Sequence, residues 1–148
     1  MTAPYLAIDV PAESAYLKCI RGFLKPVLEN RFSDDETRQI ILAIDEACAN
    51  IIKHGQGWLK PRGRIELEFV DGKKMIVVRI RNFCKESQIA KIRPRDLADV
   101  KPGGLGTHFM REVMDTMDFE PDKEHAGRVA LVMTRAVSGK GDNEAQGR

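Results

Sequence analysis

Cysteine is scarce in this sequence, and its few copies form no recognisable pattern. Cys19, Cys48 and Cys84 are odd in number, far apart, and lie in or beside apolar runs. They indicate reduced thiols in a cytosolic protein rather than a disulfide framework. Their spacing does not match that of a zinc site.

Long hydrophobic runs are also missing. No apolar stretch approaches the ~20 residues that a membrane-spanning helix needs. The N-terminus lacks the basic region followed by a long apolar core that is typical of a signal peptide. We therefore expect neither membrane insertion nor export, and a cytoplasmic location.

The chain has no strong excess of one charge either. Charged residues make up 31% of its 148 residues, yet the formal net charge is only +2. This balance provides no global field that would attract a nucleic acid or a membrane.

At this length a single domain, residues 1–137, can bury a core without disulfides or metal. We expect the polar tail, residues 138–148, to be disordered.

The strongest positive pattern lies in residues 40–57. Apolar side chains recur there at helical spacing, at Ile40, Ile41, Ile44, Ala47, Cys48, Ile51 and Ile52. Ser33, with Glu36 three residues later, forms a capping-box sequence. Asp34 and Asp35 add negative charge where the helix dipole favours it. The sequence therefore predicts a long helix that begins just after Ser33.

Three polar residues of this helix, Glu46, Asn50 and His54, lie four residues apart on a different stripe. Two interpretations fit them. The stripe is either a solvated helix face or the polar side of a site that acts on a phosphate ester. In the second case the amide oxygen of Asn50 helps to hold a hard cation, while the Glu46 carboxylate orients or deprotonates an attacking hydroxyl.

The remaining periodicities predict a two-layer α+β protein. Strands are expected at residues 6–10, 65–69, 75–81, around 119 and at 129–133, helices at 12–30 and 105–117, and a long loop at 82–106. Asp71-Gly72 is a hairpin signal, the apolar run 75–81 indicates a central strand, and Pro26 predicts a kink or restart near Lys25. This order implies a mainly antiparallel, mixed sheet covered on one face by helices.

Residues 101–107, KPGGLGT, form a second candidate site where a helix is expected to begin. Gly103, Gly104 and Gly106 let backbone N–H groups approach an anion, and the helix N-terminus favours phosphate. The same residues also fit an ordinary flexible entry to a helix. Lys101 either reaches a phosphate or is merely solvated. The spacing matches neither a P-loop nor a Rossmann fingerprint.

Taken together, the two stretches resemble a known fold. A helix carrying Glu46, Asn50 and His54, then a hairpin, then a long loop ending in Gly-Gly-x-Gly, is similar to the GHKL (Bergerat) ATP-binding fold of histidine kinases and gyrase. Within that superfamily the chain is most similar to the anti-sigma-factor serine/threonine kinases of partner-switching modules. The resemblance covers nearly the whole chain, from the first strand to Thr134.

The resemblance implies a role for each candidate residue. Glu46 is the catalytic base, Asn50 is the Mg²⁺ ligand, and His54 belongs to the nucleotide site. ATP and Mg²⁺ are therefore the expected cofactors. The phosphate-binding loop would comprise Lys101, Gly103, Gly104, Leu105, Gly106 and Thr107.

One box departs from the family pattern. After the central strand the family carries Asp-x-Gly, in which the carboxylate accepts a hydrogen bond from the adenine amino group and the glycine leaves room for the ring. Here Asn82, Phe83 and Cys84 occupy these positions. An amide can still accept that bond, though without charge assistance, while the thiol takes space where the ring would lie. Alternatively, Asn82 caps a strand end and Cys84 is a small buried hydrophobe.

The function implied by the resemblance is that of a protein serine/threonine kinase. It would bind Mg-ATP, hold a sigma factor or similar regulator, and phosphorylate a small antagonist of the anti-anti-sigma (STAS) type. Intact Glu46 and Asn50 favour this reading. Asn82 and Cys84 favour the alternative, a degenerate GHKL-fold binding module that sequesters a partner without efficient ATP use. A third reading is an ATP-binding domain acting on a histidine phosphoacceptor elsewhere. A homodimer is compatible with all three.

Overall fold

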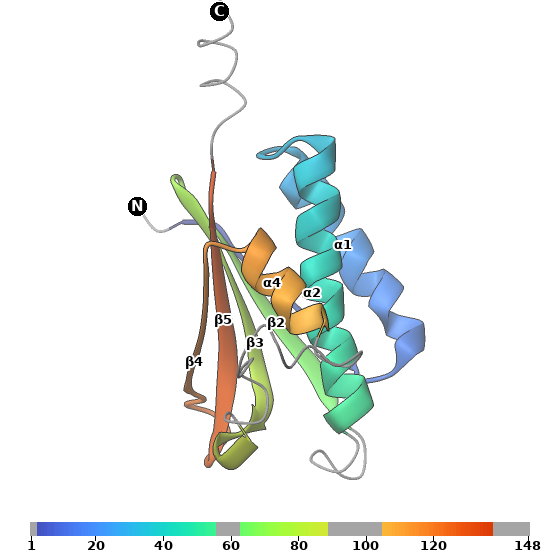
Figure 1. Cartoon of the computed structure of the whole chain (residues 1–148), viewed down its shortest axis with the longest axis vertical. Coiled ribbons are helices and arrows are strands. Elements are labelled where there is room, and N and C mark those ends of the chain that lie inside the picture. Colours follow the sequence, from blue (N-terminus) through green and yellow to red (C-terminus); the bar gives the residue numbers. More distant parts are fainter. Residues whose placement is uncertain (1–2, 56–62, 89–104, 138–148) are drawn as a thin grey trace, which may run out of the picture.

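A computed structural model describes residues 3–55, 63–88 and 105–137 of the chain (Figure 1). In chain order its elements are β1 (Tyr5–Pro11), η1 (Ser14–Tyr16), α1 (Leu17–Glu29), α2 (Asp34–Gly55), β2 (Arg64–Asp71), β3 (Met75–Lys85), η2 (Glu86–Gln88), α4 (Leu105–Val113), β4 (Thr116–Pro121) and β5 (Arg128–Ala136). No helix within these ranges combines the length and apolarity needed to cross a membrane.

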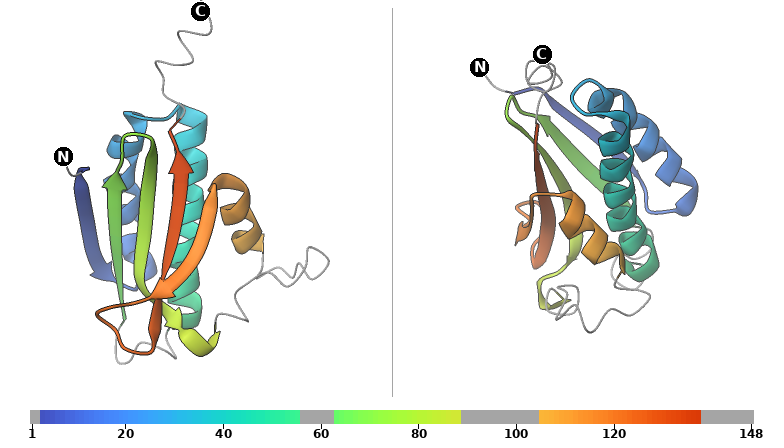
Figure 2. Two further views of the ribbon diagram at one scale, coloured as in Figure 1. Left: turned by 90° about the vertical axis from the view of Figure 1, so that its left-hand side faces the viewer. Right: turned by 45° about the horizontal axis from the view of Figure 1, so that its top comes forward.

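The strands form one sheet in the order β1-β2-β3-β5-β4, and each neighbouring pair is antiparallel. Figure 2 shows α1, α2 and α4 together on one face of this sheet. The two-layer α+β architecture is therefore confirmed. The described strands contain no parallel pair, so the sheet is antiparallel rather than mixed. β3 lies in the centre, as its continuous apolar run predicted.

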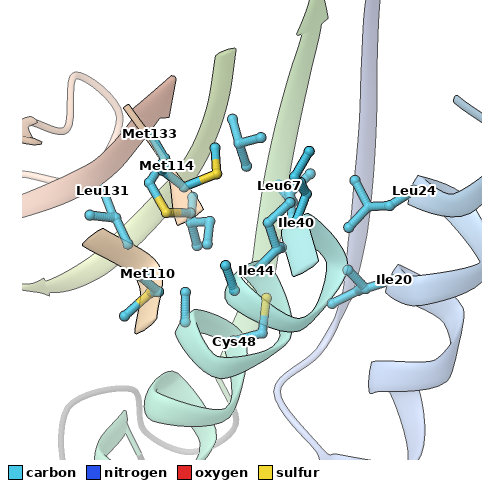
Figure 3. Packing of buried hydrophobic residues seen from close by; sticks show 14 of the residues in the cluster. Ile20, Leu24, Ile40, Ile44, Cys48, Leu67, Met110, Met114, Leu131 and Met133 are labelled. Carbon is cyan, nitrogen blue, oxygen red and sulfur yellow. The ribbon is translucent and has the colours of Figure 1, made fainter. Parts of the chain in front are cut away.

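The hydrophobic core fills the space between the sheet and the helices (Figure 3). Ile44 and Cys48 of α2 lie between Ile20 of α1 and Met110 of α4, and all four side chains are buried. Burial of one such aliphatic side chain stabilises the fold by about 1.5–3 kcal/mol. The apolar stripe of α2 therefore anchors that helix, which leaves its other stripe free to carry polar residues.

The start of α2 follows the local rule that its sequence predicted. The backbone N–H of Ser33 donates to Glu36 Oε1 and the N–H of Glu36 bonds to Ser33 Oγ, both at 3.2 Å. Burial of Glu36 opposes ionisation, but the hydrogen bonds from Ser33 and Arg135 outweigh it and lower the pKa of the carboxyl. The capping box is thus confirmed, and it fixes where α2 begins.

The β2–β3 hairpin turns at Asp71-Gly72, as predicted. A Cβ atom on Gly72 would lie 2.3 Å from the backbone oxygen of Met75, so only glycine fits. Arg31 closes this turn from the end of α1: its guanidinium bonds to Asp71 Oδ1 at 2.5 Å and to the Gly72 carbonyl at 2.9 Å. The hairpin is therefore tied to the helical layer.

Helix α1 differs from its prediction in two ways. It begins at Leu17 rather than at residue 12, and it continues through Pro26 without a restart. Proline removes the bond to the carbonyl four residues earlier, which belongs to Gly22. Both Pro26 and Gly22 are exposed, so water can bond to that carbonyl in place of the missing N–H. The helix therefore survives the proline.

The C-terminal third also corrects two boundaries. The expected loop does not begin at Asn82, because β3 continues through Lys85. The last helix ends at Val113, and Met117 lies in β4 rather than in that helix. There the N–H of Asp115 bonds to the Thr134 carbonyl at 2.8 Å and turns the chain into the sheet. Residues 89–104 of the expected loop and the tail from residue 138 lie outside the described residues.

Candidate functional site

The polar stripe of α2 contains Glu46 and Asn50, which the helical repeat places one turn apart. Both residues are half-buried. Within the described ranges neither side chain has a hydrogen-bond or ion-pair partner. By contrast, the adjacent Asp45 forms an ion pair with Arg21 at 2.8 Å. The carboxylate and the amide of the stripe are therefore available to a ligand.

Several expected site residues are only partly described or not described. His54 lies in the last turn of α2, but its side chain is outside the described part of the structure. Lys101, Gly103 and Gly104 lie outside the described residues altogether. The roles assigned to these four residues stay predictions.

The rest of the glycine-rich stretch forms the start of α4. This helix begins at Leu105, so Gly106 and Thr107 also belong to its first turn. Figure 1 shows α4 beside α2, against which it packs. The fold thus brings the helix with the polar stripe next to the helix that the glycines precede. Unpaired N–H groups at such a helix start favour an anion, and phosphate binding by this turn stays a prediction.

Arg135 of β5 holds α4 and α2 together, a role that sequence reasoning missed. Its guanidinium donates to the Val113 carbonyl, at the end of α4, at 2.5 Å, and to Glu36 Oε2, at the start of α2, at 3.0 Å. It also lies over the Phe32 ring, 5.8 Å from the centroid. A sequence signal existed: Arg135 continues the inward-facing alternation of Leu131 and Met133, where an apolar residue is expected.

Asn82 does not sit at a strand end but at an irregularity inside β3. The pairing of β3 with β5 shifts register between Ile80 and Cys84, and Asn82 has a φ of 49°. This left-handed conformation is uncommon for a side chain other than glycine, but asparagine tolerates it best. The N–H of Asn82 donates to Asp122 Oδ2 at 2.6 Å, and its Oδ1 accepts a bond from Arg128 Nε.

Phe83 and Cys84, the two residues that follow Asn82, are buried. Cys84 is fully buried, and burial raises the pKa of its thiol to about 11, so the thiol is neutral. The Phe83 ring is also buried, with its centroid 6.0 Å from that of Phe119. This surrounding agrees with the interpretation of Cys84 as a small buried hydrophobe. The Cys84 thiol is thus buried at the position where the resemblance implies a glycine.

Asp122 is a second functional candidate that sequence reasoning missed. Its buried carboxylate accepts bonds from Arg81 at 2.9 Å and from the N–H groups of Asn82 and Glu124 at 2.6 and 3.0 Å. Burial opposes its charge, but these bonds outweigh burial and lower the pKa of Asp122. The bond from Glu124, two residues on, is the local signal of an aspartate turn.

Two hollows of the described surface are lined by residues outside the polar stripe of α2. A groove of about 630 Å³ between α1 and α2 is lined by Arg21, Gly22, Lys25, Glu29, Asp34, Thr37, Arg38, Ile41, Leu42 and Asp45. It includes neither Glu46 nor Asn50. A second hollow of about 530 Å³ lies where β3 leads into η2, and Lys85, Ser87 and Arg128 are among its lining residues. The groove between α1 and α2 is therefore not where the expected chemistry would occur.

The magnesium site expected on α2 needs only a small set of protein donors. Among the described residues no three His, Cys, Asp or Glu side chains gather into a metal cluster. A magnesium ion that arrives with a nucleotide keeps waters and phosphate oxygens as ligands, so it needs few protein donors. The unpartnered amide of Asn50 fits that requirement.

Comparison with known proteins agrees with this geometry. A family model described as the histidine kinase-like ATPase domain matches residues 10–135. The "Serine-protein kinase RsbW" of Bacillus subtilis (strain 168) is 27% identical over 147 residues, covering 93% of this chain and 89% of that protein. The protein of the same name from Halalkalibacterium halodurans is 26% identical, covering 88% of this chain and 82% of that protein.

A third protein named "Serine-protein kinase RsbW", from Bacillus licheniformis, is 25% identical and covers 81% of this chain and 80% of its own length. The similarity to these serine-protein kinases is distant but extends over nearly the full length. The resemblance predicted from the two polar stretches is thereby confirmed. Because the family model covers most of the chain, this protein belongs to the histidine kinase-like ATPase domain family.

Proposed function

We propose that this protein is a protein serine/threonine kinase of the anti-sigma type, which transfers the γ-phosphate of ATP to a hydroxyl of a small antagonist protein. The observation that carries the proposal is the unpartnered pair Glu46 and Asn50, on a helix packed against the glycine-led α4. The near full-length similarity to proteins named as serine-protein kinases supports it.

Each residue has a distinct task in this proposal. Bound Mg-ATP supplies the phosphoryl group and the cation that neutralises its charge. Asn50 holds that cation through its amide oxygen. The N–H groups of the Gly106 turn, with Lys101, Gly103 and Gly104, receive the phosphates, while His54 contributes to the nucleotide site. Glu46 would accept the proton that the attacking hydroxyl loses as its oxygen bonds to the γ-phosphorus, while the bond from that phosphorus to the β–γ bridging oxygen breaks and ADP leaves.

The partners in this proposal are a sigma factor or similar regulator, which the protein holds, and a STAS-type antagonist, which it phosphorylates in the cytoplasm. The names of the similar proteins give only their kinase activity, so both partners rest on the resemblance. A homodimer is compatible with this scheme.

A degenerate binding module is the second candidate, and one observation favours it. The oxygen of Asn82 that would accept a bond from adenine is already bonded to Arg128, and Cys84 fills the position of the family glycine. Such a protein would sequester its regulator with little dependence on ATP. A domain acting on a histidine phosphoacceptor is the remaining alternative.

Calorimetric titration with Mg-ATP separates the first two candidates. The kinase should bind Mg-ATP and, when given radiolabelled ATP and the antagonist, should form a phosphoprotein stable in acid, as a phosphoserine is. A product stable in base but labile in acid would identify a phosphohistidine instead. Absence of Mg-ATP binding, in protein whose folding is verified by circular dichroism, would leave the binding module as the function.

A further inference from the structure

The orientation of the Asn82 amide is decided by its neighbour Arg128. The Oδ1 and Nδ2 atoms of an asparagine are usually hard to tell apart, so their assignment needs chemical support. A guanidinium carries only donors. The amide end that faces Arg128 Nε must therefore be the oxygen, as the structure has it.

The backbone of Asn82 is held as firmly as its side chain. Its N–H is bonded to Asp122 Oδ2 at 2.6 Å, and its carbonyl lies 3.4 Å from Arg128 Nη2. Only the amide nitrogen, Nδ2, has no hydrogen-bond partner within the described part of the chain. The polar edge that Asn82 can still offer to a ligand is thus a donor.

Arg128 has a strong reason to keep this bond. The residue is half-buried, and burial lowers the pKa of its guanidinium. A partly desolvated cation needs acceptors, since leaving it unpaired costs more than an unpaired neutral group. Turning the Asn82 amide around would bring an NH₂ group against the guanidinium and remove that acceptor. The pairing therefore stabilises one of the two amide orientations.

We propose that Arg128 determines the base specificity of the nucleotide site: by holding the Asn82 oxygen, it leaves an NH₂ donor to read the base. This inference rests on the proposed function and on the resemblance to the GHKL fold, which implies that Asn82 lies in the base pocket. Adenine presents its exocyclic amino group, also a donor, where the family carboxylate accepts a bond. Guanine presents a carbonyl at that position. Purine nucleotides with a carbonyl there, such as GTP, are accepted at least as well as ATP.

The test is competition of Mg-ATP and Mg-GTP against one ribose-labelled fluorescent ATP analogue, in the parent protein and in Arg128→Met. The parent should bind GTP as tightly as ATP or more tightly. In Arg128→Met the amide is free to turn and accept a bond. A neutral hydrogen bond corresponds to about a two- to twelvefold change in affinity, so the ATP-to-GTP preference should rise by that factor.

Arg64→Met is the matched control, because Arg64 is also a strand arginine bonded to one side chain, Asp9, but it lies on β2 at the β1 side of the sheet. It should leave the ATP-to-GTP preference unchanged. If Arg128→Met does not fold, Asn82→Asp serves instead: both ends of a carboxylate accept, so one satisfies Arg128 and the other can receive the adenine amino group. The preference for ATP should then also rise.

The outcomes separate this inference from the proposed function. Strong ATP preference in the parent, or a ratio that neither Arg128→Met nor Asn82→Asp changes, overturns the role of Arg128 and leaves the kinase intact. Failure of the analogue and of both nucleotides to bind the folded parent overturns the proposed function, and this inference falls with it.

Discussion

Asn50 and Asn82 are the same residue type at the two ends of the proposed nucleotide site, and both are half-buried. Asn50 has no side-chain partner in the described structure, whereas Asn82 is bonded through its side chain and its backbone to Arg128 and Asp122. The polar groups of Glu46 and Asn50 on α2 are left available to a ligand. The irregular part of β3 uses its polar groups to bind the β4–β5 hairpin.

The difference shows why residue type alone does not identify a binding residue. A half-buried polar group with no protein partner is costly unless a ligand or water satisfies it. A group that is already bonded can serve a ligand only with the edge that remains. The free groups of Glu46 and Asn50 therefore support the proposed site more directly than Asn82 does, because the Asn82 oxygen is already bonded to Arg128. Four predictions test that contrast.

The largest effect is expected at the free carboxylate. Glu46→Gln should reduce phosphoryl transfer by about 10²–10⁴-fold, because an amide cannot take the hydroxyl proton. Mg-ATP affinity should stay nearly the same, since Glu46 is not proposed to bind the nucleotide. Single-turnover assays with radiolabelled ATP and calorimetry measure the two quantities.

Asp45→Asn is the control for Glu46, because Asp45 is the adjacent carboxylate on α2 and is engaged by Arg21. It should leave both transfer and binding unchanged. A Glu46→Gln protein that phosphorylates the antagonist at the parental rate would show that Glu46 is not the base.

The second-largest effect is expected on stability, at Asp122, which accepts bonds from Asn82 and Arg81. Asp122→Asn should destabilise the protein by about 1–3 kcal/mol at pH 7. An amide nitrogen would replace one of the two oxygens that accept bonds from Arg81, Asn82 and Glu124, so at least one of these donors would lose its acceptor. Urea unfolding measures this change. Glu124→Gln is the control, since Glu124 is 65% exposed and lies 3.7 Å from the same Arg81.

Acid should reduce the difference between the parent and Asp122→Asn. The folded-state pKa of Asp122 is lowered, so its stabilisation is fully present above the unfolded pKa of about 3.9 and is lost as pH falls through the folded value. The gap in unfolding free energy should therefore be smaller at pH 3 than at pH 7. An equal gap at both values would mean that the charge of Asp122 contributes nothing to stability.

The third effect is expected at the free amide. Asn50→Ala should weaken Mg-ATP binding by about tenfold to a hundredfold, the range for one contact to a charged group. Binding of nucleotide without magnesium should change much less. Gln39→Ala, which removes an exposed amide from the same helix, should change neither. Equal weakening with and without magnesium would remove Asn50 as the cation ligand.

The smallest effect is expected on nucleotide affinity, when the family's Asp-x-Gly pattern is restored at residues 82 and 84. Asn82→Asp with Cys84→Gly provides a charged acceptor and more room for the ring, so ATP binding should tighten by roughly tenfold at most. GTP should lose affinity, because its carbonyl would face a carboxylate. Competition of both nucleotides for one fluorescent analogue gives the ratio. If strong ATP preference is present in the parent and unchanged in the variant, the base is read elsewhere.

Much of the fold was predictable because local rules govern it. The helical period indicated α2 and both of its stripes, the Ser33–Glu36 capping box marked its start, and Asp71-Gly72 marked the hairpin. The errors occurred where tertiary contacts overrode the local pattern. Met117 continues the period of α4, yet the bond between Asp115 and Thr134 draws that segment into the sheet.

The amino-acid sequence by itself determined the elements, the free polar stripe of α2 and the family, since each depends on neighbours three or four residues apart or on the order of motifs. Only the tertiary structure decided what Asn82 does. Its partners Asp122 and Arg128 lie 40 and 46 residues further along the chain, and Arg135 reaches Glu36 across 99 residues. Such contacts depend on strand register and on packing between layers, which no local period encodes.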